Sequence, residues 1–171
     1  MNTPKKIFIL GTSGSGKTTL AKKLSKHLKI AHYDLDDIFW INKYDKKLPR
    51  YKRKIKLKKL VKKSKWIIEG VYGSWTGAAI RESEIIIWLL PGRLTLSKRL
   101  ILRGITREKE IKNKVIGTYH LWRYMMKYYN SDKSSGYLGH LKITKRYKKK
   151  LVIIKKNGDL KILNSIFGKI I

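Results

Sequence analysis

The sequence has no cysteine and few acidic residues. Its 171 residues include 11 Asp and Glu against 42 Lys and Arg, which gives a formal net charge of +31. The absence of cysteine excludes disulfides and thiolate metal sites, and it fits a protein of the reducing cytoplasm. The positive charge would attract polyanions such as nucleic acid. However, 33 of the basic residues are lysine, and a chain rich in lysine and isoleucine is also what an AT-rich genome would encode.

Long hydrophobic runs are also missing. The longest run, Ile85–Leu90, is far shorter than the ~20 residues of a membrane-spanning helix. The run Ile7–Leu10 is too short for the apolar part of a signal peptide, and no small-residue cleavage site follows it. We therefore expect a soluble, cytoplasmic protein without a membrane span. The length fits one compact domain over residues 1–171.

Short apolar stretches alternate with amphipathic stretches along the chain. This alternation predicts an α/β fold in which helices cover both faces of a parallel sheet. The expected strands are Lys5–Leu10, Ala31–Asp34, Trp66–Glu69, Ile85–Leu90 and Leu151–Lys155. The expected helices are one that starts at Gly16 or Lys17, followed by Tyr51–Lys63, Gly73–Arg81, Arg93–Leu102, Lys112–Tyr129, Leu138–Lys149 and Leu160–Phe167. The polar residues Asn130–Gly136 are expected to form a loop.

A phosphate-binding loop is predicted at Gly11–Thr18, which matches G-x-x-x-x-G-K-[ST] at every fixed position. Its glycines allow a tight turn that brings N–H groups against phosphate oxygens, and the helix that follows directs its positive end at the same anion. Lys17 would reach the β- and γ-phosphates of ATP, and the hydroxyl of Thr18 would ligate Mg²⁺. The residues expected to bind the nucleotide are Gly11, Thr12, Ser13, Gly14, Ser15, Gly16, Lys17, Thr18 and Thr19.

Acidic residues follow two of the expected strands, although Ile85–Leu90 ends without one. Asp34 and Asp36 follow the second strand, and Glu69 ends the third. Because the carboxyl ends of parallel strands border the same crevice, we expect these side chains near the phosphate loop. Asp36 is the first candidate for the base or orienting carboxylate of a kinase, and it could equally hold an acceptor's hydroxyls. A turn or N-cap Asp and a salt-bridged Glu are the structural alternatives.

Three arginines, Arg99, Arg103 and Arg107, recur at a spacing of four residues and would line one face of a helix. Arginine binds phosphate oxygens with paired hydrogen bonds and stabilises charge on a transferred phosphoryl group. Arg99 and Arg103 are therefore candidate catalytic residues, with a solvated helix face as the alternative. We expect Gly104 to interrupt this helix and Gly104–Lys114 to act as a lid.

Several pieces of the sequence together resemble a known family. They are Gly11–Thr18 after an N-terminal strand, Leu35–Trp40, Trp66–Tyr72, Arg81–Glu84 and the pair Arg99 and Arg103. The pattern looks like that of the adenylate-kinase-like P-loop proteins called FlaR-like or "DNA topology modulation protein". More broadly, it is similar to the nucleoside monophosphate and shikimate kinases. The likeness extends over about residues 5–107.

The resemblance implies a P-loop NTPase fold, with a five-stranded parallel sheet of order 2-3-1-4-5 and helices on both faces. It also implies ATP and Mg²⁺ as cofactors, phosphate-clamping or lid roles for Arg99 and Arg103, an acceptor-side helical segment at about 43–65 and a lid-like segment at about 104–137. Glu69 stands where relatives commonly have Asp. The resemblance gives Asp36 a substrate or magnesium role and gives Glu69 and Gly70 a phosphate-facing role. Together with the strand-end argument, the residues predicted to bind substrate are Asp34, Asp36, Glu69, Gly70 and Arg81.

The leading prediction is an ATP-dependent small-molecule kinase that transfers the γ-phosphoryl group to a nucleotide or another small phosphorylated acceptor. The segment Lys43–Lys65, with 13 basic residues and one acid, fits such an acceptor. A polynucleotide-end kinase and an ATP-dependent nucleic-acid-binding or regulatory module are the alternatives. For the last of these, Tyr124, Tyr128 and Tyr129 could stack on bases, although aromatics at helical spacing are more often packing residues.

Overall fold

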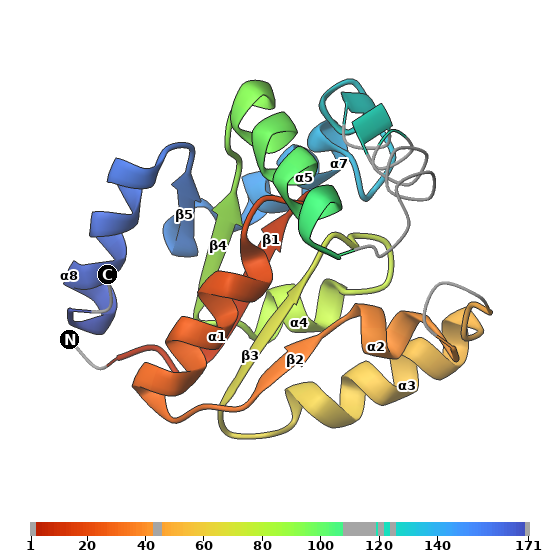
Figure 1. The fold of residues 1–171 in the computed structure, drawn as a ribbon. Coiled ribbons are helices and arrows are strands. Elements are labelled where there is room, and N and C mark those ends of the chain that lie inside the picture. The colour runs from red at the N-terminus through yellow and green to blue at the C-terminus, as the bar shows by residue number, and fades with distance from the viewer. Residues whose placement is uncertain (1–2, 43–45, 108–118, 120–121, 124–125, 170–171) are drawn as a thin grey trace.

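A five-stranded parallel sheet forms the centre of the molecule in the part of the chain that the structure describes (Figure 1). The computed structural model describes residues 3–42, 46–107, 119, 122–123 and 126–169. The strand order is β2-β3-β1-β4-β5 with parallel pairing throughout, which confirms the order that the resemblance implies. The strands are β1 (Lys6–Gly11), β2 (His32–Asp34), β3 (Trp66–Gly70), β4 (Ile85–Leu89) and β5 (Leu151–Ile154).

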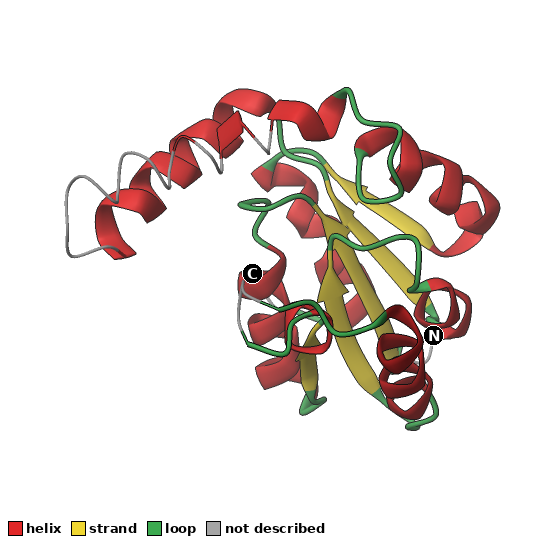
Figure 2. Ribbon diagram, turned by 90° about the vertical axis from the view of Figure 1, so that its right-hand side faces the viewer, coloured by secondary structure: helices red, strands yellow, loops and turns green. Residues whose placement is uncertain are grey.

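Helices cover both faces of this sheet (Figure 2). Over the described residues, none of them combines the length and the apolar character needed to cross a membrane. The helices are α1 (Lys17–Leu28), α2 (Asp36–Phe39), α3 (Arg50–Val61), α4 (Gly77–Glu82), α5 (Arg93–Arg107), α7 (Tyr137–Thr144) and α8 (Lys161–Phe167), with 3₁₀ segments η1 (Lys145–Lys150) and η2 (Asn157–Leu160).

The alternating side chains of β1 pack into two separate hydrophobic cores, one on each face of the sheet. Ile7 and Ile9 pack with residues of α1 and α8, whereas Phe8 and Leu10 pack with residues of α3 and α4. All four side chains are buried. A parallel strand buried on both faces has this continuous apolar sequence, and its packing holds the carboxyl end of the central strand β1 firmly in place.

Several predicted helices differ from the structure, and the one expected at Gly73–Arg81 begins only at Gly77. The predicted interruption at Gly104 is wrong, because α5 continues to Arg107. A single glycine costs a helix interior only about 1 kcal/mol, which the surrounding sequence can offset. The helix predicted at 138–149 ends at Thr144 and passes into the 3₁₀ segment η1. Most of the helix predicted at 112–129 falls outside the described residues, and of the lid-like segment 104–137 the residues 108–118, 120–121 and 124–125 do so.

Candidate functional site

The phosphate loop, Gly11–Thr18, connects β1 to α1 through three glycines. Gly14 has a φ of 75° and Gly16 a φ of 98°, in the left-handed region that side chains disfavour. At Gly11, an added Cβ would lie 2.6 Å from Ser15 Oγ and 2.7 Å from the carbonyl oxygen of Leu89. Space at Gly11 and conformation at Gly16 therefore require glycine where the motif fixes it, and conformation favours glycine also at Gly14, a variable position of the motif.

Helix α1 begins directly after the loop with uncapped N–H groups. Its N-cap, Gly16, makes no side-chain capping hydrogen bond, and its first turn has no acidic residue. The positive end of the helix dipole therefore faces the loop without a neutralising side chain of its own. Thr12 Oγ1 and Ser15 Oγ are buried and have no hydrogen-bond partner among the described residues. These donors fit a bound phosphate, which supplies the acceptors that they need.

Lys17 and Thr18 connect the loop to Glu69 at the end of β3. Thr18 Oγ1 donates a hydrogen bond of 2.6 Å to Glu69 Oε1. Lys17 Nζ lies 3.9 Å from Glu69 Oε2 and donates to the Thr12 carbonyl at 3.0 Å. Burial raises the pKa of the Glu69 carboxyl, but the nearby His32, Lys17 and Thr18 outweigh burial and hold this pKa below its usual value. Glu69 is therefore ionised at neutral pH.

Two further carboxyl groups lie at the end of the neighbouring strand β2. Asp34 is the register partner of Glu69, and its Oδ1 accepts the N–H of Asp36 at 2.9 Å. The pKa of Asp34 is raised to about 6, mainly by burial and also by the charges of Glu69, Asp36 and Asp37, against the opposing effect of that N–H. Asp36 Oδ1 accepts a hydrogen bond of 2.6 Å from the hydroxyl of Tyr72. The structure thus brings the predicted acidic residues together with the phosphate loop.

Arg53 of α3 is a candidate functional residue that the sequence reasoning missed. Its guanidinium carbon lies 4.4 Å from the ring centroid of Phe39 and 5.6 Å from that of Trp75. Phe39 in turn stacks on Tyr72, with ring centroids 4.4 Å apart. Arg53 Nε is buried and has no hydrogen-bond partner within the part of the chain that the structure describes. Burial lowers the pKa of this guanidinium, and an anionic group beside it would relieve that cost.

Arg99 of α5 also contacts the phosphate loop. Its Nη1 donates to the carbonyl oxygen of Ser15 at 3.0 Å, and its Nη2 donates to Asn157 Oδ1 at 3.2 Å. The side chain therefore joins the loop to η2 at the end of β5. The side chains of Arg103 and Arg107 lie outside the described residues, so their roles stay predictions.

Gly70 lies at the site, whereas Arg81 does not. An added Cβ at Gly70 would lie 2.8 Å from Cδ1 and 2.9 Å from Cβ of Leu35, so the glycine allows the chain after β2 to pack closely on β3. Arg81 is exposed and its Nε lies 3.4 Å from Glu82 Oε1. It lies near the end of α4, just before β4 begins, so it is at the amino-terminal ends of the strands, and the phosphate loop is at their carboxyl ends. Its place in the fold therefore does not support the predicted role in substrate binding.

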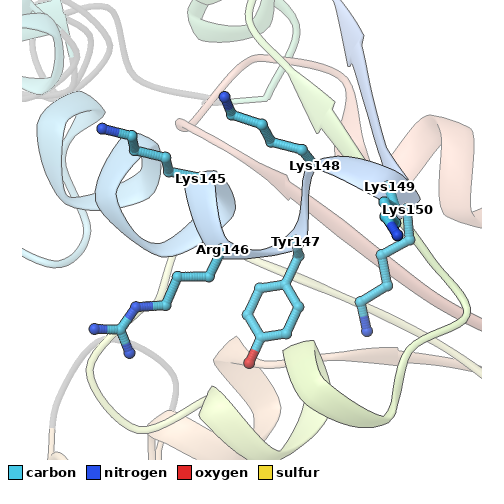
Figure 3. Close-up of a pocket in the computed structure, with 6 residues that line it drawn as sticks. All are labelled: Lys145, Arg146, Tyr147, Lys148, Lys149 and Lys150. Carbon is cyan, nitrogen blue, oxygen red and sulfur yellow. The ribbon is translucent and has the colours of Figure 1, made fainter.

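A hollow lies along η1 (Figure 3). Lys150 Nζ donates to the carbonyl oxygens of Ile80, Arg81 and Ser83 at 2.6 to 2.8 Å, so it caps the last turn of α4. Since η1 leads into the start of β5, the hollow lies at the amino-terminal ends of the strands, whereas the phosphate loop follows the carboxyl end of β1. The hollow has a volume of about 440 Å³ and is lined by Lys145, Arg146, Tyr147, Lys148, Lys149 and Lys150.

The tyrosines considered for base stacking are packing residues where the structure describes them. Tyr128 is 3% exposed and its hydroxyl lies in a buried hydrogen-bond chain. The hydroxyl of Tyr129 donates to the carbonyl oxygen of Pro91. Tyr124 lies outside the described residues. Tyr128 is therefore not available to stack on a base.

Sequence comparison identifies the family. A family model described as "AAA domain" (AAA_18) matches residues 7–119, more than half of the chain. The curated relative "Uncharacterized protein YqaC" of Bacillus subtilis (strain 168) is 37% identical over 87 residues. These residues are 50% of this chain and 48% of the relative, so the chain spans about half the length of the curated relative that it matches.

Solved structures share the fold at low sequence identity. A gluconokinase from Sinorhizobium meliloti 1021 matches with a TM-score of 0.61 and 12% identity, over 98% of this chain and 91% of that one. A shikimate kinase from Bacteroides thetaiotaomicron matches with a TM-score of 0.56 and 14% identity, over 95% and 97% of the two chains. A shikimate kinase from Acinetobacter baumannii, solved with shikimate, matches with a TM-score of 0.53 and 17% identity, over 95% and 92%. The chain belongs to the AAA domain family AAA_18 and has a P-loop NTPase fold of the kinase-like type.

Proposed function

We propose that the chain is a small-molecule kinase that uses ATP and Mg²⁺, and that it is a member of the FlaR-like group of adenylate-kinase-like P-loop proteins. The observation that carries this proposal is the 2.6 Å hydrogen bond between Thr18 and Glu69. It joins the phosphate loop to the strand end beside Asp34 and Asp36. A phosphate loop alone fits any NTPase, whereas a phosphate loop beside carboxylates that can orient a hydroxyl fits phosphoryl transfer.

The phosphate groups of the nucleotide would lie on the loop. Lys17 and the uncapped N–H groups of α1 would hold the β- and γ-phosphates. Thr18 would be a ligand of Mg²⁺, with Glu69 orienting its hydroxyl. Magnesium, when bound, supplies positive charge that offsets the negative charge of the phosphate oxygens. Arg99, which already contacts the loop at Ser15, would stabilise the charge of the transferred group.

Asp36 would orient the hydroxyl of the acceptor and take its proton. In this step the acceptor oxygen forms a bond to the γ-phosphorus while the bond from that phosphorus to the β,γ-bridging oxygen breaks, so ADP leaves. The proton of the acceptor hydroxyl passes to the carboxylate of Asp36. Tyr72, which donates to Asp36 Oδ1, holds the carboxylate in place during this step.

The acceptor would carry an anionic group. Arg53 contacts Phe39, which stacks on Tyr72, the hydrogen-bond donor to Asp36. It lies on a helix whose exposed residues are mainly basic, and the described residues 46–65 include no acid. A phosphate or carboxylate on the acceptor would fit the guanidinium of Arg53, and the positive face of α3 would draw such an acceptor to the site. A neutral sugar would use neither feature.

A phosphoryl-transfer screen tests the proposed function. Purified protein with Mg-ATP is offered nucleoside monophosphates, phosphorylated and carboxylated metabolites, neutral sugars and 5′-hydroxyl oligonucleotides, and both ADP release and the phosphorylated product are measured. We expect one small anionic acceptor to yield a product, and Lys17→Ala to bind and turn over ATP at least ~100-fold more weakly while its melting temperature stays close to that of the wild type. Slow ADP release that no acceptor accelerates, together with salt-sensitive nucleic-acid binding, would instead support a nucleic-acid-binding module.

A further inference from the structure

Three consecutive hydrogen bonds, two of them buried and the third partly buried, link β4 to the segment after β3. Trp88 Nε1 donates to the hydroxyl oxygen of Tyr128 at 3.1 Å, and this oxygen lies 2.8 Å from His140 Nδ1. His140 Nε2 lies 2.8 Å from the carbonyl oxygen of Val71. An indole N–H can only donate and a carbonyl can only accept, so the two ends determine the direction of every bond. Tyr128 therefore donates to Nδ1 of His140, and Nε2 of His140 carries the proton that is donated to Val71.

The three hydrogen-bonded side chains are all uncharged at neutral pH. Trp88 is 1% exposed, Tyr128 3% and His140 0%. Burial lowers the pKa of His140 to about 4, with the bond to Val71 opposing this effect and the charge of Lys17 adding to it. The neutral imidazole keeps one donor and one acceptor, which is what its two neighbours need.

The carbonyl that His140 holds belongs to the peptide unit between Val71 and Tyr72. The carbonyl of Tyr72 is fixed as well, since it accepts a hydrogen bond of 2.7 Å from Thr76 Oγ1. The hydroxyl of Tyr72 donates to Asp36 Oδ1 at 2.6 Å. His140 thus holds one end of a short covalent stretch, from the Val71 carbonyl to the Tyr72 side chain, and the other end is hydrogen-bonded to the carboxylate that we assign to the acceptor.

The neighbouring glycine shows how closely this segment packs. An added Cβ at Gly73 would lie 2.1 Å from the carbonyl oxygen of Ser134, in the loop that separates Tyr128 from α7. The backbone after β3 therefore lies directly against the same part of the chain that carries His140. Such contact leaves Val71 and Tyr72 little room to move as long as the hydrogen bonds persist.

We propose that His140 is a positioning residue for phosphoryl transfer, which holds the Val71 carbonyl and thereby sets the place of the Tyr72 hydroxyl on Asp36. The inference rests on the proposed function, because it assigns the acceptor hydroxyl to Asp36. A displacement of about 1 Å in such a group can cost about 100-fold in rate. Loss of the bond from His140 to Val71 should therefore lower kcat strongly and change the affinity for ATP little.

Two amide variants distinguish the roles of the two ring nitrogens of His140, Nδ1 and Nε2. The amide nitrogen of His140→Gln extends to about the position of Nε2 and can still donate to Val71, whereas the shorter side chain of His140→Asn ends near Nδ1 and cannot. We expect kcat of His140→Gln to stay within about threefold of the wild type. We expect kcat of His140→Asn to fall by about 10- to 100-fold with an unchanged KM for ATP.

Tyr128→Phe is the matched control for a purely structural role. It removes a buried hydroxyl from the same chain and leaves the bond between His140 and Val71 in place. We expect its melting temperature to fall about as much as that of His140→Asn, while its kcat stays close to that of the wild type. Equal kcat values for His140→Asn and His140→Gln, or a kcat that follows the melting temperature in all three variants, would overturn the proposal.

Crystal structures of the same variants test the positioning independently of activity. In His140→Asn the Val71 carbonyl should turn and the hydrogen bond between Tyr72 and Asp36 should break, and in Tyr128→Phe both should stay as they are. An intact bond between Tyr72 and Asp36 in His140→Asn would overturn the proposal even if the enzyme is active. If the wild type transfers no phosphoryl group to any acceptor, the proposed function fails, and the structures still decide whether His140 sets the position of Tyr72.

Discussion

Replacing Asp34 by Asn should stabilise the folded protein at neutral pH. Burial raises the pKa of this carboxyl from 3.8 to about 6, so the folded protein binds the proton more tightly than the unfolded chain does. The asparagine has nearly the same shape and retains the oxygen that accepts the N–H of Asp36. The substitution therefore removes the cost of a buried charge while the local hydrogen bond remains.

The sign and size of the effect follow from the direction of this shift. A raised pKa in the folded state means that the contribution of Asp34 to stability is full below about pH 4 and is lost as the pH rises through 6. The shift of about two units corresponds to ~3 kcal/mol. Because the carboxyl of Asp34 is only partly buried, solvent screening reduces the expected gain to about 1–2 kcal/mol at pH 8. At pH 4 the variant and the wild type should be nearly equal.

Urea unfolding at pH 4, 6 and 8, in EDTA, measures this gain. Glu69→Gln is the matched control on the partner strand, because its pKa is shifted in the opposite direction. The contribution of Glu69 is present above the unfolded-state pKa and is lost as the pH falls, so Glu69→Gln should destabilise the fold at pH 8, on the order of 2 kcal/mol, and less at pH 4. A gain for Asp34→Asn that is absent at pH 8, or equal at pH 4 and 8, would refute the reasoning.

Three further substitutions test the site. Asp36→Asn should lower the rate of phosphoryl transfer by at least about 100-fold and leave ATP affinity, measured by calorimetry, nearly unchanged. Gly11→Ala should lower both the melting temperature and ATP affinity, because its Cβ would lie 2.7 Å from the Leu89 carbonyl, whereas a Cβ at the control position Gly77 meets nothing within 4 Å. Arg99→Ala should weaken ATP binding by about tenfold in the same calorimetric assay, as it removes a charged hydrogen bond to the phosphate loop.

The strands could be predicted from the sequence because they are buried on both faces. A strand such as Ile85–Leu89 has an uninterrupted run of β-branched and aromatic residues, and its ends were predicted to within one residue. Helix ends were harder to predict. The helix expected from Gly73 begins at Gly77, and α5 passes through Gly104. Glycine shifts the local preference by only about 1 kcal/mol, so packing elsewhere decides where a helix ends.

The phosphate loop could be predicted because its residues are contiguous in the sequence. Its backbone conformation requires glycine, and glycine can be recognised from the sequence alone. Arg53 and His140 could not be predicted in this way. Arg53 is one of many basic residues on α3, and only the fold places it over the rings of Phe39 and Trp75. His140 is 69 residues from its acceptor Val71. No local pattern specifies a contact across that separation.

The pKa values of the neighbouring carboxyl groups of Asp34 and Glu69 are shifted in opposite directions because their contacts at the carboxyl ends of β2 and β3 differ. Asp34 and Glu69 face each other in register, but only Glu69 has a hydroxyl donor and the charge of Lys17 within reach. Burial is the largest cause of the raised pKa of Asp34, and repulsion by the neighbouring carboxylate adds to it, so the better-paired Glu69 stays charged and Asp34 holds its proton to higher pH. Lys17 and Thr18 of the phosphate loop contact Glu69 at the end of β3. The carboxyl of Asp34 at the end of β2 is without these contacts, so its pKa should respond to the charge of a ligand that binds beside it.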